Sequence, residues 1–80
     1  MKLESARRLA RLKAIAHRPF VVAAEEQTDD AWVFTLGDPD GRTVDANLPI
    51  IVIDKEGRGV REVRLPSPEG FALLKELRSL

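Results

Sequence analysis

An apolar stretch followed by a charged, glycine-containing stretch constrains the fold of this chain more than any other feature. Residues 48–54 read Leu-Pro-Ile-Ile-Val-Ile-Asp, a run rich in β-branched side chains that ends at an acidic residue. The charged stretch 55–59 follows, and a second apolar run begins at Val60. This pattern predicts a strand, a turn and a returning strand, with Gly57 and Gly59 supplying positive φ in the turn.

The two ends of the chain carry helical patterns. In residues 3–17, leucine, isoleucine and alanine recur at helical spacing, and most basic side chains fall outside this apolar stripe. Pro19 ends the helix, because the residue before a proline is disfavoured in the α region.

A second helix is predicted near the C-terminus. Ser67 is a good N-cap residue and Pro68 suits the first helical position. The side chains expected to face the core are Phe71, Leu74 and Leu77 or Arg78, with Leu73 and Leu77 beside them.

Strand patterns fill the region between the two helices. The segments expected to form strands are 20–27, 31–36, 49–54 and 60–65, while 42–47 is either a loop or a short edge strand. Alternation places Trp32, Phe34 and Leu36 on one face, which we expect to be core. The continuous apolar run at 49–54 predicts a strand buried on both faces, and the mixed run at 60–65 predicts a half-exposed edge strand.

These elements follow one another in the order α-β-β-β-β-α. We expect one small α+β domain over residues 1–80, with a mostly antiparallel sheet of three to four strands flanked by an N-terminal and a C-terminal helix. Both helices are expected to pack on one face of that sheet. The chain has no cysteine, so disulfide bonds do not contribute to its stability.

No residue pattern in the sequence indicates catalysis. The only histidine, His17, lies at a predicted helix end, and Ser67 is explained by capping, so no nucleophilic triad is expected. The stretch 38–41, Asp-Pro-Asp-Gly, is typical of a turn and lacks the further oxygen ligands of a calcium loop. Gly57-x-Gly59 lacks the helix that follows a nucleotide-binding turn. We therefore expect no enzymatic activity, no cofactor and no metal.

The formal net charge is zero, but the charge is unevenly distributed. Residues 1–18 are mostly basic and residues 25–45 are mostly acidic. In a first interpretation, the two blocks face each other or simply keep the chain soluble. In a second interpretation, the acidic block binds a partner. In the second interpretation the partner-binding residues are Glu25, Glu26, Asp29, Asp30, Asp38, Asp40 and Asp45.

We expect a cytoplasmic protein that does not act on membranes. No apolar run is long enough for a transmembrane helix, the basic start is not followed by a secretory apolar segment, and absence of cysteine fits a reducing compartment. The basic helix 3–17 leaves nucleic-acid binding through Arg7, Arg8 and Arg11 as one alternative, although the neutral chain and its few aromatic residues argue against it. A second alternative is a structural or adaptor protein that assembles through its sheet edge or helices. The chain itself is expected to be a monomer or a weak homodimer.

The chain resembles the YrhB-like immunity domains. In that family a tryptophan-centred strand precedes a hairpin of the form Pro-x-x-Val-Asp/Asn followed by Gly-x-Val, and a proline-containing step leads into a C-terminal helix. The corresponding residues here are Trp32-Val33-Phe34, Leu48 to Asp54 with Gly57 or Gly59 and Val60, and Pro66 to Phe71. The resemblance covers residues 5–78, and this chain has one additional residue between Val52 and Asp54.

The resemblance implies an antitoxin-like role without enzymatic activity. Members of such a family bind a cognate bacterial toxin, often a nuclease or a deaminase, and block its active site. For this chain, the acidic block would then be the natural contact for a basic toxin that acts on nucleic acid, because it imitates phosphate charge.

Overall fold

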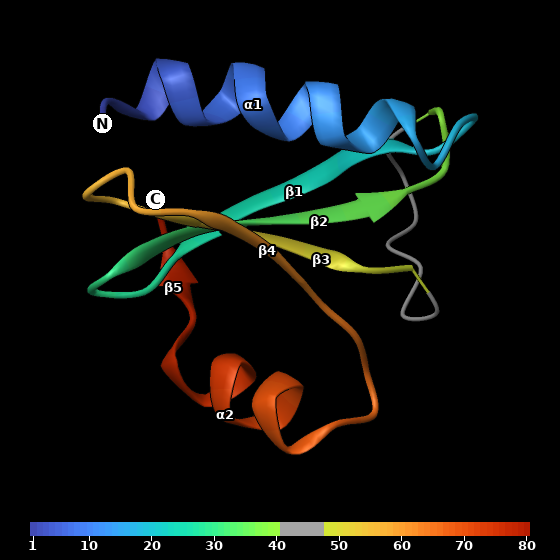
Figure 1. The fold of residues 1–80 in the computed structure, drawn as a ribbon. Helices are drawn as coiled ribbons and strands as arrows, with labels where there is room; N and C mark the ends of the chain where they lie inside the picture. The colour runs from blue at the N-terminus through green and yellow to red at the C-terminus, as the bar shows by residue number, and fades with distance from the viewer. Residues whose placement is uncertain (41–47) are drawn as a thin grey trace.

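A five-stranded antiparallel sheet with one helix on each side forms the fold, as seen in a computed structural model that describes residues 1–40 and 48–80 (Figure 1). The elements in chain order are α1 (Leu3–Ile15), β1 (Val21–Gln27), β2 (Ala31–Gly37), β3 (Ile50–Asp54), β4 (Val60–Val63), α2 (Pro68–Glu76) and β5 (Arg78–Ser79). The strands lie in the order β4-β3-β2-β1-β5, and all neighbours are antiparallel. The predicted α+β class is confirmed, and β5 is an addition to the predicted order.

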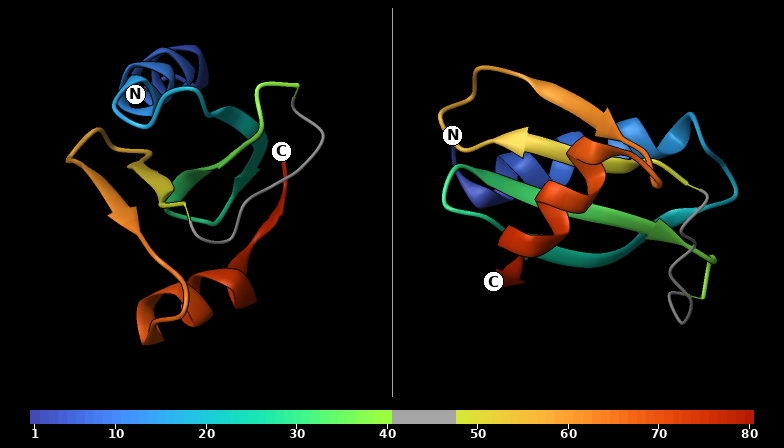
Figure 2. Two further views of the ribbon diagram at one scale, coloured as in Figure 1. Left: turned by 90° about the vertical axis from the view of Figure 1, so that its right-hand side faces the viewer. Right: turned by 90° about the horizontal axis from the view of Figure 1, so that it is seen from below.

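The two helices cover opposite faces of the sheet, so the expectation that both pack on one face is wrong (Figures 1 and 2). The core accordingly consists of two clusters separated by the backbone of β2 and β3. The cluster under α1 contains Ala6, Ala10, Ala14, Phe34, Leu36, Ile51 and Ile53. The cluster on the α2 side contains Ala31, Val33, Ile50, Val52, Val63 and Leu73. Because β2 and β3 are apolar on both faces, each face needs its own cover.

The strand predictions around the hairpin are largely confirmed. Phe34 and Leu36 are fully buried on the α1 side, and Trp32 packs against the same cluster. The apolar part of β3 is buried on both faces, and β4 is an edge strand of the sheet. In the turn between them, Gly57 has a φ of 79°, whereas Gly59 does not have positive φ.

Helix α1 lies against the sheet through three alanines, Ala6, Ala10 and Ala14, all of which are buried. Their small side chains let the helix backbone approach the strands closely. The helix ends at Ile15, before the predicted end at residue 17, and a turn follows towards Pro19.

Helix α2 begins as predicted but buries a different side. The Gly70 N–H donates to the Ser67 hydroxyl at 2.9 Å, which confirms Ser67 as the N-cap. Leu73 is buried, whereas Phe71 is 54% exposed and Leu74 is 44% exposed. The expected core stripe is therefore wrong, because α2 reaches the sheet from the opposite side and turns Leu73 towards it.

The predicted segment 42–47, whether loop or strand, lies outside the described residues.

Candidate functional site

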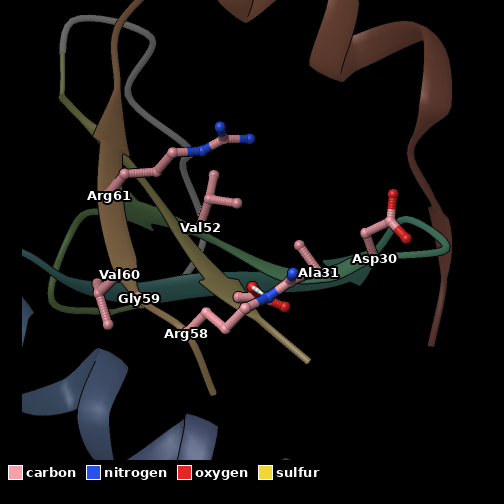
Figure 3. Close-up of a pocket in the computed structure, with 8 residues that line it drawn as sticks. Asp30, Ala31, Val52, Arg58, Gly59, Val60 and Arg61 are labelled. Atoms are coloured by element: carbon pink, nitrogen blue, oxygen red, sulfur yellow. Dashed lines mark hydrogen bonds and ion pairs between the residues drawn. The ribbon is translucent and has the colours of Figure 1, made fainter. Parts of the chain in front are cut away.

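An open groove of about 500 Å³ lies at the end of the sheet where β1 turns into β2 and β3 turns into β4 (Figure 3). Its lining residues are Asp30, Ala31, Val52, Asp54, Arg58, Gly59, Val60 and Arg61. Ala31 and Val52 are buried and provide an apolar floor, and Arg61 and Asp30 extend on either side of it (Figure 3). The groove thus combines an apolar floor with a charged rim.

Strand pairing brings these residues together from distant parts of the sequence. Ala31 of β2 lies opposite Asp54 of β3, and the Lys55 N–H donates to the Asp30 carbonyl oxygen at 2.9 Å. The Thr28 hydroxyl accepts from the Ala31 N–H at 3.1 Å, which fixes the β1–β2 turn. The two turns are therefore held side by side by backbone hydrogen bonds.

Asp54 is the most strongly engaged carboxylate of the groove. The Glu56 backbone N–H donates to Asp54 Oδ1 at 2.9 Å, and Arg58 Nε donates to Oδ2 at 2.9 Å. The backbone bond from Glu56, with a smaller effect of Arg58, holds the pKa of Asp54 below its ordinary value. Asp54 is therefore ionised at neutral pH and oriented by two donors.

Asp30 differs from Asp54, although both line the groove. In the part of the chain that the structure describes, the Asp30 carboxylate makes no hydrogen bond and no ion pair; only its backbone groups are engaged. Arg61, on the other side of the groove, contacts Glu69 of α2 at 3.2 Å, and both side chains are exposed. The rim thus offers one unpaired negative charge and one weakly paired positive charge.

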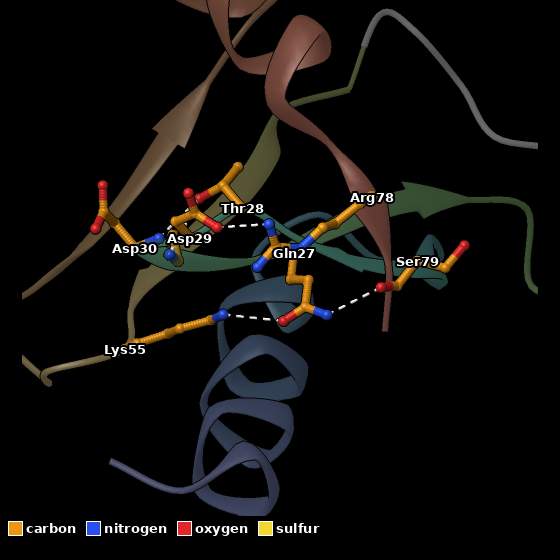
Figure 4. A network of polar contacts seen from close by, with 8 residues as sticks. Gln27, Thr28, Asp29, Asp30, Lys55, Arg78 and Ser79 are labelled. Atoms are coloured by element: carbon orange, nitrogen blue, oxygen red, sulfur yellow. Dashed lines mark hydrogen bonds and ion pairs between the residues drawn. The ribbon is translucent and has the colours of Figure 1, made fainter.

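A polar network next to the groove joins β5 to the β1–β2 turn (Figure 4). Gln27 Nε2 donates to the Ser79 carbonyl oxygen at 2.9 Å, and Lys55 Nζ donates to Gln27 Oε1 at 2.9 Å. Arg78 donates to Asp29. These contacts hold the C-terminal strand beside the groove.

The predicted acidic residues on β1 point to opposite faces of the sheet. A β-bulge between Val22 and Ala24 shifts the register, so that Glu25 lies opposite Phe34 and faces α1. Glu25 accepts from Arg7 Nε at 3.0 and 3.2 Å, and this bond, with a second to Glu4, raises the pKa of Arg7. For this pair, the interpretation that the acidic and basic blocks face each other is confirmed.

The remaining predicted residues do not form one surface with Glu25. Glu26 lies opposite Val33 and faces the α2 side, while Asp29 and Asp30 lie in the β1–β2 turn. Asp38 and Asp40 follow β2, at the end of the sheet opposite to Asp30. Asp45 lies outside the described residues. Only Asp30 of the predicted set lines the groove.

Asp54, Arg58 and Arg61 belong to the groove but were not predicted as site residues. Their signal in the sequence is the hairpin itself, since pairing β3 with β4 places residues 54 and 61 near the same turn. They lie close to Asp30 only because β2 pairs with β3, and a single sequence does not specify this pairing.

No three histidine, aspartate or glutamate side chains within residues 1–40 and 48–80 are placed to hold a metal ion. Neither of the two described helices has the length and apolar character needed to cross a membrane. Comparison with known proteins finds no matching family model, no matching curated protein and no matching solved structure.

Proposed function

We propose that this chain is a non-enzymatic protein-binding module that binds and neutralises a cognate bacterial toxin in the cytoplasm. The observation that carries the proposal is the groove, where the unpaired Asp30 carboxylate stands beside an apolar floor of Ala31 and Val52. An apolar centre with a polar rim is the usual composition of a protein–protein contact. The resemblance to the YrhB-like immunity domains supports the proposal, because the residues that carry it include those of β2, β3 and β4 around this groove.

On its Asp30 side, the groove suits a basic side chain of a partner, although Arg58 and Arg61 also line it. Asp30 has a free carboxylate at the rim, and Asp54 is kept ionised by its donors. A basic side chain of a toxin, such as a nuclease or a deaminase, would approach Asp30 and pack its carbon stem over Val52. Complementary charge of this kind raises the association rate and selects the partner.

A growth-rescue assay tests the proposal most directly. The chain is co-expressed with the products of its adjacent open reading frames, one at a time. We expect one neighbour to be toxic and growth to be restored when this chain is present and binds it. If none of the neighbours is toxic and no complex forms, the proposal is wrong.

Asp30 and Asp38 then provide a matched pair of variants for locating the contact. Asp30 directly precedes β2 and Asp38 directly follows it, but only Asp30 lines the groove. We expect Asp30→Asn to lower the association rate with the toxin by about three- to tenfold at low salt, and Asp38→Asn to leave it unchanged. Equal effects of the two variants on the association rate would show that the groove is not the contact site for the toxin.

Nucleic-acid binding is the second candidate, because Arg8 and Arg11 are exposed on α1 and have no ion pair among the described residues. DNA affinity that falls steeply with salt, and is lost when both arginines are neutralised, would favour this function.

A further inference from the structure

The outer edge of β4 has backbone groups that are free to pair with another strand. The Asp54 N–H donates to the Gly59 carbonyl oxygen at 3.1 Å, and positions along an antiparallel ladder alternate between hydrogen-bonded and non-hydrogen-bonded pairs. Val60 and Glu62, opposite Ile53 and Ile51, are therefore in non-hydrogen-bonded positions. Their N–H and C=O groups point away from β3, and no described strand lies beyond them.

A second groove, of about 420 Å³, lies beside this edge, between β4 and the C-terminal half of α1. It is lined by Leu12, Lys13, Ala16, Val60, Arg61 and Glu62. Leu12 is 64% exposed and offers an apolar contact beside this edge. Val60 packs against the cluster under α1, and Glu62 Oε1 lies 3.0 Å from His17 Nε2, so both side chains face α1.

The rim of this groove is basic. Lys13, the basic residue of α1 that lines the groove, has no ion pair within the part of the chain that is described. Glu62, the acidic lining residue, is already engaged by His17. Arg61 has only its exposed contact with Glu69, and such surface pairs contribute little. An occupant of the groove therefore meets mainly positive charge.

We propose that an extended, acidic segment of a partner protein adds to β4 as a further strand of the sheet, with its side chains on one face entering the groove beside α1. An apolar side chain opposite Val60 would pack on Leu12 and Ala16. The adjacent position, opposite Arg61, would carry a carboxylate, since directly opposed side chains in a sheet interact. Alternation of acidic and apolar residues is therefore the chemistry that this edge recognises.

A second copy of this chain fits the edge less well than an acidic segment does. Symmetric antiparallel pairing of two β4 strands brings the two basic rims together. It also places Glu62 opposite Glu62 or Arg61 opposite Arg61 in the registers centred on the strand, and like charges directly opposed are destabilising. This inference does not rest on the proposed toxin-binding function, because it is argued from the free edge of β4 and the groove beside α1, although Arg61 lines both grooves.

The probe is a short blocked peptide that alternates glutamate and valine, titrated into the full chain at low salt while backbone amide chemical shifts are recorded. We expect shifts confined to β4 and to residues 12–16 of α1. A peptide that alternates lysine and valine is the control, and we expect it to bind about tenfold more weakly or less.

Two pairs of variants separate strand addition from simple charge attraction. Glu62→Pro removes the outward N–H without costing a bond to β3, and Glu62→Ala removes the same side chain but keeps that N–H. We expect the proline variant, once its fold is verified by circular dichroism, to bind the glutamate peptide about tenfold more weakly than the alanine variant. Arg61→Glu should weaken binding to a similar extent, because it places like charges opposite each other, whereas Lys75→Glu on α2 should not.

Three results would overturn the inference. The first is equal affinity of Glu62→Pro and Glu62→Ala for the glutamate peptide. The second is tighter binding of a short DNA duplex than of that peptide, with shifts limited to the outer face of α1. The third is sedimentation that shows dimers in the wild type and monomers in Glu62→Pro, which would assign the edge to a second copy.

Discussion

Arg7 Nε donates to both carboxylate oxygens of Glu25, at 3.2 and 3.0 Å, and so joins α1 to β1 across 18 positions of the chain. The contact depends on the β-bulge between Val22 and Ala24, because without the shifted register Glu25 would face away from α1. Arg7 also contacts Glu4 one turn earlier in the helix. A local irregularity of one strand thus decides how the charged blocks of the sequence meet.

Removing the carboxylate of Glu25 should weaken this connection slightly. We expect Glu25→Gln to lower the midpoint of urea unfolding and Glu26→Gln, whose side chain faces the other side, to leave it unchanged. Both residues of the pair are partly exposed, so the effect should shrink at high salt. Additive effects of Arg7→Ala and Glu25→Gln in a double-mutant cycle would contradict the contact.

Replacing Leu73 and Leu74 in turn tests which side of α2 packs against the sheet. Leu73 is 6% exposed and lies in the cluster on the α2 side, whereas its neighbour Leu74 is 44% exposed. We expect Leu73→Ala to lower the free energy of unfolding by about 2–5 kcal/mol, and Leu74→Ala to change it by less than about 0.5 kcal/mol. Chemical denaturation measures both, and the reverse order would restore the stripe expected from the sequence.

Gly70 and Gly59 should respond differently to replacement by alanine. A Cβ at Gly70 would lie 2.6 Å from Leu65 Cδ2 and 3.0 Å from the Arg64 carbonyl oxygen, whereas a Cβ at Gly59 meets nothing within 4 Å. Alanine normally stabilises a helix relative to glycine. We nevertheless expect Gly70→Ala to lower the melting temperature and Gly59→Ala to leave it unchanged or raise it slightly. A rise for Gly70→Ala would show that Leu65 moves aside freely.

Asp54 should contribute to the pH dependence of stability. Its pKa in the folded chain lies below the ordinary value of 3.8, mainly because the Glu56 N–H donates to it. The stabilisation is therefore fully present above that ordinary value and is lost as the pH falls through the lower, folded pKa. We expect the difference in unfolding free energy between wild type and Asp54→Asn to be constant at neutral pH and to shrink at acidic pH. A difference that grows on acidification would contradict the assignment.

Periodicity in the sequence predicted the elements whose burial or start is determined by their own and neighbouring residues. The run from Ile50 to Ile53 is apolar on both sides, and the structure buries it on both faces. Ser67 and Pro68 mark the start of α2 because capping is a local interaction. The hairpin of β3 and β4 follows from neighbouring segments with a turn between them.

Long-range pairing explains what the sequence did not predict. Placing α2 opposite α1 requires knowing which face of β2 and β3 remains uncovered, and both faces carry apolar side chains. The two-residue strand β5 has no pattern of its own and is held by its pairing with Glu26 and Gln27. The groove beside Asp30 likewise exists only because β2 lies next to β3, so its residues are scattered in the sequence.

The division of the core by the sheet has a consequence for how this chain fluctuates. Helix α2 reaches its cluster mainly through Leu73, with Leu65 and Leu77 packed at the margin, and β5 adds only a two-residue ladder. We expect such a segment to form a separate cooperative opening unit, whose amides exchange with solvent at lower free energy than those of β2 and β3. The α1 side of the sheet would stay intact when this unit opens, and the opening would transiently expose Val33 and Val52 to solvent.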